Sequence, residues 1–541
     1  MKHRIEKDPL GPVRVPAAAY YGAQTQRAVE NFPISGLTAP PELITATVMI
    51  KRAAALTNAE LGRLDRRVAK AIAAAADEVL AGTHRSQFVV DVYQAGAGTS
   101  HNMNTNEVLA NRAAELLGGS RGEYTRVHPN DHVNMGQSTN DVFPTATRLA
   151  LLLMLPDLLQ AGRALADGFA RKSGEFREVL KTGRTHLQDA VPMTLGQEFS
   201  GYAANVAYAV DEVERSAHGL HELNLGATAL GTGINAGDDY TAGAIARLAD
   251  GTGIPVRPAG DRFRVTQSMG DVLAYSGALR RLAAEVSKIA SDLRLLSMGP
   301  RAGLSEIRLP AVQPGSSIMP GKVNPSIPEM VNQVCYQVFG CDAAILAAAE
   351  AGQLELNVMM PVIAWNAIHA TRILRQAMRV LQDRCVSGIQ ADAARCRELL
   401  DRSTAVATAL SPYLGYAATA DLAKEAVQTG RPVRDLVLER RLLPEADLER
   451  ILSVEAMTSP GVPGQAEGTR SHAKRTRTPK VRGADRRPPD RGGRTGTGSA
   501  AARRPVSAGT ARDARRAGSG RLAAARPGDG RAADRRRKRS R

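Results

Sequence analysis

The sequence predicts an all-α protein whose centre is a bundle of long helices, and composition and apolar spacing carry that prediction. Of the 541 residues, 43% are hydrophobic but only 4% are aromatic, so a core must be built from Ala, Leu, Val and Ile. From Asp271 to Met298, and again from Val331 to Ala348, apolar residues recur at alternating spacings of three and four. Such spacing predicts long helices that pack along a shared seam, and about 28 residues, as in the first run, correspond to about 40 Å. Helices that are apolar on several faces also indicate partners beyond one chain.

Polar runs and prolines mark the parts of the chain. Residues 42–81 are predicted to be helical, whereas the runs at 95–106 and 128–141, rich in Gly, Ser, Thr, Asn and His, are typical of site loops. Pro144 and Pro156 are expected to begin or kink the helix that leads into the bundle. We therefore expect an N-terminal domain (1–140), a central helix-bundle domain (141–390), a small helical C-terminal domain (391–460) and a tail (461–541).

The net charge of +17 would suggest a nucleic-acid partner, but the position of the charge argues against one for the body of the protein. The tail, 461–541, holds 24 of the 71 Lys and Arg residues but only 6 of the 54 Asp and Glu residues, which leaves residues 1–460 near neutrality. With one leucine and no Ile, Phe, Tyr, Trp or Met, the tail cannot offset its ordering entropy and is predicted to be disordered. A genuine tail and an accidental, frame-shifted extension both stay open, and any nucleic-acid contact is expected from the tail only.

Cysteine usage and hydropathy indicate in which cellular compartment the protein is expected. The four cysteines include no C-x-x-C pair, which argues against a disulfide framework and a structural zinc site and fits a reducing cytoplasm. The N-terminus is charged where a signal peptide needs an apolar stretch, and the best apolar run, 149–155, is ended by a proline and an aspartate. We expect a cytoplasmic protein without a membrane span.

The side chains that could perform chemistry lie in four polar segments, which are residues 96–106, 137–141, 183–189 and 315–325. Prolines and glycines recur through the last of these, so it must be a loop between the two periodic helices. The segments share an excess of neutral hydrogen-bond donors, beside the cation Lys322 and the candidate base His186. Neutral donors around a cation bind a small carboxylate. The donors are Thr99, Ser138, Thr139, Asn140, Thr185 and Asn324.

Each segment also has a purely structural interpretation. Ser138 to Asn140 could cap a helix that starts near Asp141, a residue favourable at the positive end of a helix. His186 could be a satisfied buried histidine, and Gly315 to Ser317 could be a flexible turn. The residues alone leave these interpretations open beside the catalytic one.

Two other kinds of site are disfavoured. His128 and His132 are four residues apart, but no cluster of Asp or Glu accompanies them, so we prefer a structural role and expect no metal. Ser316 lacks the strand-turn-helix elbow of a hydrolase nucleophile.

Taken together, the polar segments resemble the signatures of the fumarase/aspartase superfamily, lyases that eliminate a group from a succinyl-type substrate to give fumarate. The sequence GSSIMPGKVNP (315–325) is similar to the signature loop of that superfamily. Further segments resemble its aspartase and class II fumarase branch, namely GAGTSHNMNTNEV (96–108), HPNDHVN (128–134), QSTND (137–141) and GRTHLQDAVPMTLGQEF (183–199). The resemblance covers residues 1 to about 465. It implies a mostly α-helical, three-domain subunit, a homotetramer with one shared helix bundle, active sites assembled from three chains, and no cofactor.

Within this branch the resemblance leans toward the ammonia-eliminating members. The segments 222–233 and 350–359, together with Thr139, look like those members, which implies the elimination of ammonia from L-aspartate to give fumarate. His101 and Met360 depart from the pattern, because a smaller apolar residue and a glutamate are more usual there. Fumarate hydratase activity, which converts L-malate to fumarate and water, stays open as the alternative.

The resemblance also implies a role for each matching residue. Ser316 would be the base that removes a proton from Cβ, in the field of Lys322. Thr99, Ser138, Thr139 and Ser317 would hold the β-carboxylate, Lys322 and Asn324 the α-carboxylate, and Asn140, Thr185 and His186 the amino group. Glu329 would pair with His186 and set its tautomer. An inactive structural protein on the same fold is the alternative of a different class, and the presence of all these residues disfavours it.

Overall fold

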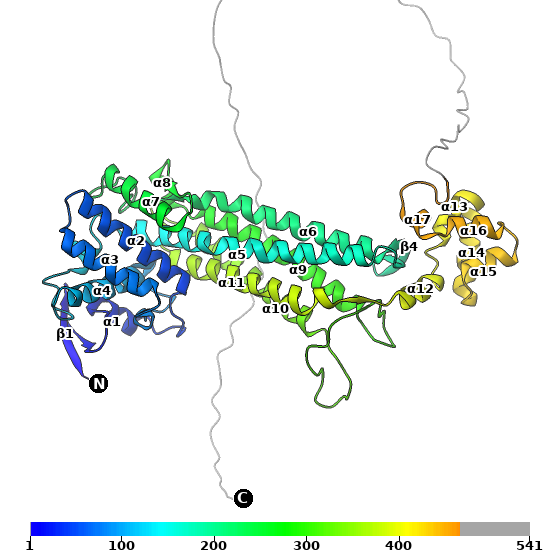
Figure 1. The fold of residues 1–541 in the computed structure, drawn as a ribbon, viewed down its shortest axis with the longest axis horizontal. Helices are drawn as coiled ribbons and strands as arrows, with labels where there is room; N and C mark the ends of the chain where they lie inside the picture. The colour runs from blue at the N-terminus through cyan, green and yellow to red at the C-terminus, as the bar shows by residue number, and fades with distance from the viewer. Residues whose placement is uncertain (1, 466–541) are drawn as a thin grey trace, which may run out of the picture. The chain divides into compact units, whose positions relative to one another are not determined.

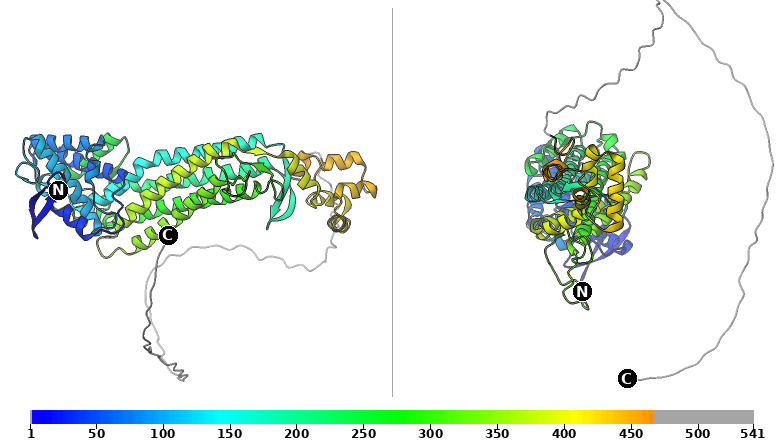
Figure 2. Two further views of the ribbon diagram at one scale, coloured as in Figure 1. Left: turned by 90° about the horizontal axis from the view of Figure 1, so that it is seen from below. Right: turned by 90° about the vertical axis from the view of Figure 1, so that its right-hand side faces the viewer.

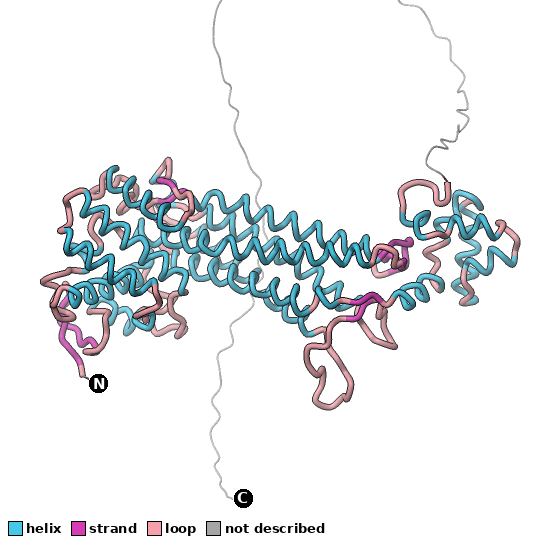
Figure 3. Tube along the Cα trace, in the orientation of Figure 1, coloured by secondary structure: helices cyan, strands magenta, loops and turns pink. Residues whose placement is uncertain are grey.

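The structure is a computed structural model that describes residues 2–465, and most of these residues are helical (Figures 1 and 3). The basic tail predicted to be disordered lies outside the described residues, except for residues 461–465. The strands are short and occur in pairs. The predicted all-α class is therefore confirmed for the described part of the chain.

A bundle of five long helices forms the centre of the protein (Figures 1 and 2). Its members are α5 (Thr139–Glu175), α6 (Leu195–Ser216), α9 (Gly270–Leu296), α10 (Ser326–Glu350) and α11 (Met360–Arg384). Helix α5 packs against α6 and α11, and α10 packs against α9 and α11. The two periodic runs form most of α9 and α10, with only the last two residues of the first run beyond α9, and their apolar positions, such as Leu279, Val286, Val338 and Ile345, are buried. The prediction of long helices packed along a seam is confirmed.

Helix α5 differs in detail from the prediction. It begins at Thr139 and contains both Pro144 and Pro156, so neither proline begins it. It is also long and apolar enough to cross a membrane, but 78% of its most apolar window is buried inside the protein. Burial against α6 and α11 explains the apolar composition without a membrane.

One end of the bundle carries the N-terminal elements (Figure 1). They are the antiparallel pair β1 (His3–Asp8) and β2 (Gly11–Pro16) and the helices α1 (Ala23–Asn31), α2 (Pro41–Glu60), α3 (Arg66–Leu80) and α4 (Thr99–Leu116). Helices α7 (Asp238–Thr252) and α8 (Arg262–Gln267), and the parallel pair β5 (Glu222–Leu223) and β6 (Arg257–Pro258), lie at this end too. The prediction of helices over 42–81 is confirmed by α2 and α3.

The polar run at 95–106 is a correction, because α4 begins at Thr99 and most of the run is helical. Asparagine is unfavourable inside a helix, because its side-chain amide can form hydrogen bonds with nearby backbone groups in non-helical conformations. Here the amides find tertiary partners instead, since Asn104 donates to the carbonyl of Gln87 and accepts from the N–H of Val89. These tertiary hydrogen bonds outweigh the low helix propensity of asparagine.

The opposite end of the bundle carries the hairpin β3 (Leu180–Thr185) and β4 (Gln188–Thr194) and a group of short helices. The helices are α12 (Ala393–Asp401), α13 (Ala407–Leu414), α14 (Tyr416–Thr429), α15 (Val433–Glu439), α16 (Glu445–Ile451) and α17 (Val454–Thr458). Strand β7 (Ile307–Arg308), which follows α9, pairs antiparallel with β8 (Gln390–Ala391), which precedes the short helices. The short helices have an apolar core of their own, which includes Leu410, Leu436 and Leu448. The described residues form one compact unit, so the division into three domains stays a prediction.

Candidate active site

At the N-terminus of α5, the side chains of Ser138, Thr139 and Asn140 are half-buried. The Ser138 hydroxyl accepts a hydrogen bond from the N–H of Asn140 at 3.2 Å, and the Ser138 N–H donates to the Asp141 carboxylate at 3.0 Å. These bonds form a capping box, so the predicted helix cap is confirmed. The cap also holds Thr139 and Asn140 at the positive end of α5, where a carboxylate binds favourably.

Asp141 anchors a second segment to this turn. Its carboxylate, which has no exposed surface, also accepts from the N–H groups of Gly226 and Thr228 at 3.0 and 2.9 Å. Burial raises the pKa of Asp141 to about 7, although these backbone donors act in the opposite direction. The Asn140 amide donates to the carbonyl of Ala229 at 2.7 Å. The segment 222–233, which the sequence marked only by resemblance, therefore wraps the N-terminus of α5.

Gly98 places Thr99 at the start of α4. Its φ is +82°, and a Cβ at this position would lie 2.1 Å from Cδ2 of Phe143 on α5. Only glycine meets both demands. The N–H of Ala97 donates to the carbonyl of Val358 at 2.8 Å, so the segment 350–359 lies against the same turn. Four segments distant in sequence thus meet at one end of the bundle, namely 96–106, 137–141, 222–233 and 350–359.

The loop 310–325 closes on itself at its base. The N–H of Gly315 donates to the carbonyl of Lys322 at 2.8 Å, and the amide of Asn324 donates to the carbonyl of Gly315 at 2.8 Å. Asn324 thus holds the base of the loop through its Nδ2. Beyond this base, Ser317 and Lys322 are exposed, and Ser316 is half-buried.

The Ser316 hydroxyl has a defined environment inside that loop. Its Oγ accepts hydrogen bonds from the N–H groups of Ile318 and Met319 at 3.2 and 3.1 Å. Two backbone donors aimed at one oxygen favour a negative charge on it. The sequence analysis did not identify these two donors, because backbone groups leave no residue signature.

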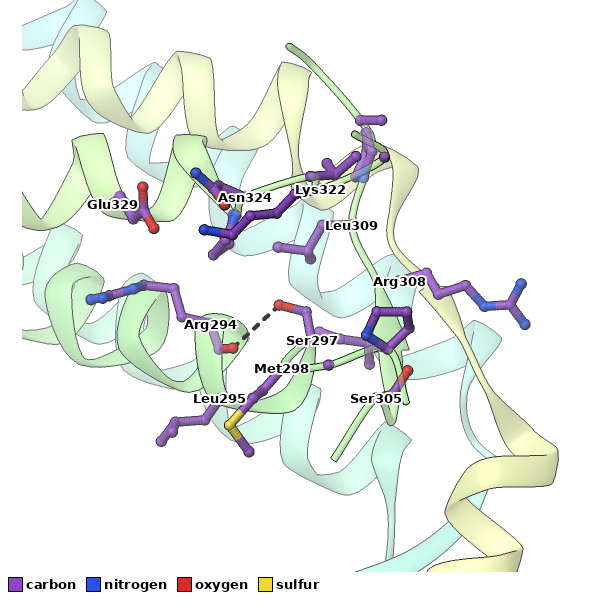
Figure 4. Close-up of a pocket in the computed structure, with 18 of the residues that line it drawn as sticks. Arg294, Leu295, Ser297, Met298, Ser305, Arg308, Leu309, Lys322, Asn324 and Glu329 are labelled. Atoms are coloured by element: carbon purple, nitrogen blue, oxygen red, sulfur yellow. Dashed lines mark hydrogen bonds between the residues drawn. The ribbon is translucent and has the colours of Figure 1, made fainter. Parts of the chain in front are cut away.

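A cavity of about 880 Å³ lies at the base of the loop (Figure 4). Lys322, Asn324 and Glu329 line one side of it, and Arg294 and Met298 line the other. The structure therefore brings three of the predicted site residues together around a cavity that also contains a second cation, Arg294.

Thr185 and His186 lie at the exposed tip of the β3–β4 hairpin. His186 and Leu187 have φ values of +54° and +59°, the tight primed turn that matches the twist of paired strands. His186 is therefore not the buried histidine that the sequence left open. No hydrogen bond joins His186 to Glu329 among the residues that the structure describes, so their pairing stays a prediction.

A buried cluster of charged side chains fixes the β3–β4 hairpin to the segment before β7. The carboxylate of Glu306 has no exposed surface and contacts Lys181 and Arg184 of β3 at 3.1 and 2.9 Å. Lys181 also donates to Glu198 of α6 at 2.5 Å. Glu306 directly precedes β7, so the cluster ties the hairpin to the segment that leads into the Ser316 loop.

The predicted site residues thus form two groups at opposite ends of the bundle. Thr99, Ser138, Thr139 and Asn140 lie at the N-terminal end, while the hairpin tip and the Ser316 loop lie at the other end (Figures 1 and 2). Helix α5, with 37 residues, separates them by about 55 Å at 1.5 Å per residue. A single chain cannot bring both groups to one small substrate.

Several supporting residues were missed by the sequence analysis. Arg148 is fully buried in α5 and donates to Asp271 at 2.6 Å, and Lys51 is fully buried in α2. For both residues, the sequence feature that could have revealed them is a charged residue inside an otherwise apolar helical run. The Nδ1 atoms of His128 and His132 each accept a backbone N–H within the turn 128–132, as a structural role requires, and the expectation of no metal there stays a prediction.

Comparison with protein families identifies two matches. A family model described as lyase matches residues 11–340, and a model described as the fumarase C C-terminus matches residues 406–459. Similar curated proteins are aspartate ammonia-lyases. The protein from Pseudomonas aeruginosa is 52% identical over 460 residues, which cover 84% of this chain and 97% of its own. The proteins from Escherichia coli K12 and from a Bacillus species are 51% and 49% identical, over 84% and 85% of this chain and 96% and 99% of their own.

Solved structures with the same fold agree with these matches. A crystal structure of a fumarate lyase:delta crystallin from Brucella melitensis is 50% identical with a TM-score of 0.82, and it covers 85% of this chain and 100% of its own. A class II fumarase from Schistosoma mansoni is 38% identical with a TM-score of 0.81, at the same coverage of both chains.

Proposed function

This chain belongs to the fumarase/aspartase superfamily of lyases, and from that membership we propose that it is an aspartate ammonia-lyase, which eliminates ammonia from L-aspartate to give fumarate. The observation that carries the proposal is identity of about 50% over nearly the whole length of several aspartate ammonia-lyases. The polar groups at the two ends of the bundle supply the donors, the cation and the serine that this reaction needs.

The chemical difficulty is the removal of a weakly acidic proton from Cβ. The Ser316 alkoxide takes this proton, and the electron pair moves into the β-carboxylate to form an enediolate. The pair then returns to form the C=C bond, and the Cα–N bond breaks with its electrons on nitrogen, so that ammonia leaves. No electrons are gained or lost overall, so the reaction requires no redox cofactor.

The environment of Ser316 supports its assignment as the base. The N–H groups of Ile318 and Met319 point at its Oγ, and the cation of Lys322 follows on the same loop. Both stabilise an alkoxide, and the effect grows when the site closes and excludes water. Closure of the loop over the substrate follows from this requirement.

The remaining site residues receive their roles from the family. Carboxylates need donors, and the enediolate, with two negative oxygens, needs them most. The proposed assignments are Thr99, Ser138, Thr139 and Ser317 for the β-carboxylate, Lys322 and Asn324 for the α-carboxylate, Asn140, Thr185 and His186 for the amino group, and Glu329 as the partner of His186.

An active site of this composition requires more than one chain. Because α5 separates Thr139 from the hairpin that carries His186, we propose that more than one chain contributes to each site. From the family we propose a homotetramer in which three chains contribute to each site. We also propose a cytoplasmic location, supported by the four buried cysteines, all of them unpaired.

The test is fumarate absorbance with purified protein, first with L-aspartate and then with L-malate. Fumarate production from L-aspartate is expected. Production from L-malate alone would contradict the proposal in favour of the fumarate hydratase alternative. The Ser316→Ala variant should lose turnover while keeping its assembly size by light scattering, and near-normal turnover of that variant would contradict the assignment of the base.

A further inference from the structure

A buried polar network lies directly behind the turn that presents Thr139. At its deep end, the ammonium of Lys51 has no exposed surface and donates hydrogen bonds to Oδ1 of Asn134 and Oε1 of Gln137, both at 2.9 Å. The nitrogens of these two amides are held elsewhere, because Nδ2 of Asn134 donates to the carbonyl of Gln137 at 3.1 Å and Nε2 of Gln137 donates to the carbonyl of Val133 at 3.1 Å. The amide oxygens of Asn134 and Gln137 therefore face Lys51.

This constraint passes from Lys51 to Asn102 on α4. Oδ1 of Asn134 also lies 3.2 Å from Nδ2 of Asn102 and 3.2 Å from Nδ2 of Asn106. Because that oxygen is an acceptor, both neighbours must present their NH2 groups to it. The orientation leaves Oδ1 of Asn102 buried without a hydrogen-bond partner, whereas the flipped amide would place two acceptor oxygens, those of Asn102 and Asn134, against each other.

The second hydrogen of the same amide reaches the candidate site. Nδ2 of Asn102 lies 3.1 Å from Oγ1 of Thr139, so the Thr139 oxygen accepts this bond. Within residues 2–465 the Thr139 hydroxyl donates to no protein group, and its side chain is half-buried at the mouth of the turn. Its hydrogen is therefore free to point out of the network.

We infer that Asn102 is a positioning residue that commits the Thr139 hydroxyl to donate its hydrogen to the substrate carboxylate. A hydroxyl can donate or accept, and an oxygen that turns its lone pairs toward a carboxylate repels it. The chain from Lys51 through Asn134 and Asn102 removes that choice, because each link fixes the direction of the next. The inference rests on the proposed function, in which Thr139 holds the β-carboxylate.

The arrangement has a consequence for substrate class. A hydroxyl committed to donation favours a group that only accepts, which is a carboxylate, over a carboxamide that presents an NH2. Together with the neighbouring hydroxyl of Ser138, it makes this end of the site selective for a carboxylate. We expect loss of Asn102 to weaken this selectivity by lowering the affinity for the dicarboxylate.

The experiment is a double-mutant cycle on the full chain, with KM and kcat measured for L-aspartate. Asn102→Leu keeps the shape of the side chain and removes the donor, and Thr139→Val keeps the shape of Thr139 and removes the hydroxyl. We expect Asn102→Leu to raise KM about tenfold, a typical loss for one hydrogen bond to a charged group. In the Thr139→Val background, the same change should raise KM less than about twofold, because its effect passes through the hydroxyl.

The matched control is Asn106→Leu, one turn further along α4. Asn106 donates to the same oxygen of Asn134 and is equally buried, but it does not reach Thr139. A KM within about twofold of the wild-type value is expected for this variant. An equal rise in KM for Asn106→Leu would show that the whole network acts structurally and would overturn the inference.

A second variant tests the direction of the hydrogen bond. Asn102→Asp keeps the shape of the side chain, adds a negative charge and reverses the hydrogen bond, since a carboxylate accepts the Thr139 hydrogen and draws it inward. KM should rise at least as much as in Asn102→Leu, and an unchanged KM would overturn the inference. So would additive effects of Asn102→Leu and Thr139→Val. If wild-type protein releases no fumarate from L-aspartate, the proposed function fails instead, so the two failures are distinguishable.

Discussion

Arg184 donates a hydrogen bond from Nη1 to Oε1 of Glu306 at 2.9 Å, and the Glu306 carboxylate is fully buried. This bond joins the hairpin that carries His186 to the segment that leads into the Ser316 loop. Two parts of the candidate site that are about 120 residues apart in sequence therefore share one buried carboxylate.

We predict that Glu306→Gln lowers the free energy of unfolding by about 3 kcal/mol or more, because it leaves Lys181 and Arg184 without their shared buried charge partner. Thermal and urea unfolding measure the effect. The control is Glu178→Gln, which breaks the exposed pair of Arg177 and Glu178 and should change stability by less than about 1 kcal/mol. Equal effects of the two variants would contradict a structural role for the buried cluster.

Gly98→Ala should destabilise the protein and displace Thr99. The new Cβ would lie 2.1 Å from Phe143, and the backbone would be held at φ +82°. Gly118→Ala is the matched control, because Gly118 has φ +76° but nothing within 4 Å of its Cβ position. The control should lose about 1 kcal/mol from backbone strain alone, whereas Gly98→Ala should lose at least twice that amount. Comparable losses in chemical denaturation would show that the contact with Phe143 is unimportant.

His101 should make stability depend on acid pH. Burial, and the nearby charge of Lys51, lower the pKa of His101 from 6.5 to about 4. In the unfolded chain this imidazole is protonated below pH 6.5, whereas in the folded protein it stays neutral down to about pH 4. The group therefore lowers the free energy of unfolding progressively as pH falls from 6.5 to 4. The raised pKa of Asp141 has the opposite effect, so wild-type stability alone does not isolate the histidine.

The His101→Val variant isolates it by difference. Between pH 6.5 and 4, the variant should gain up to about 3 kcal/mol relative to wild type, because one pKa unit corresponds to about 1.4 kcal/mol. At neutral pH it should be the less stable of the two, since it loses the contact of His101 Nε2 with the Thr47 hydroxyl. Urea unfolding at a series of pH values gives both results, and a difference in stability that does not change with pH would refute this account.

Asn324→Ala should open the base of the Ser316 loop, because it removes the bond to the carbonyl of Gly315. One lost hydrogen bond of about 1 kcal/mol corresponds to about fivefold faster opening. Trypsin cleavage after the exposed Lys322 reports it, and kcat should fall with it. Gln313→Ala, an exposed position on the same segment, serves as the control and should be cleaved at the wild-type rate. Unchanged cleavage of Asn324→Ala would mean that the bond does not hold the loop.

Much of the fold was predictable because apolar periodicity is a local property. The seams of α9 and α10 follow from three-four spacing that any buried helix must satisfy. The helical run from Thr99 was not predictable, because asparagines such as Asn104 satisfy their amides through partners that only the folded chain supplies.

For the candidate site, the residue types were readable but their arrangement was not. The sequence by itself determined the helical class, the near-neutral body and the identity of the polar segments, since these depend on composition and spacing. The tertiary structure alone decided that Ser316 Oγ receives two backbone N–H groups and that Asn102 sets the direction of the Thr139 hydroxyl. It also placed the two groups of site residues a helix length apart. Hydrogen-bond direction and distance across a bundle arise only when segments far apart in the chain are packed together, so no local pattern could encode them.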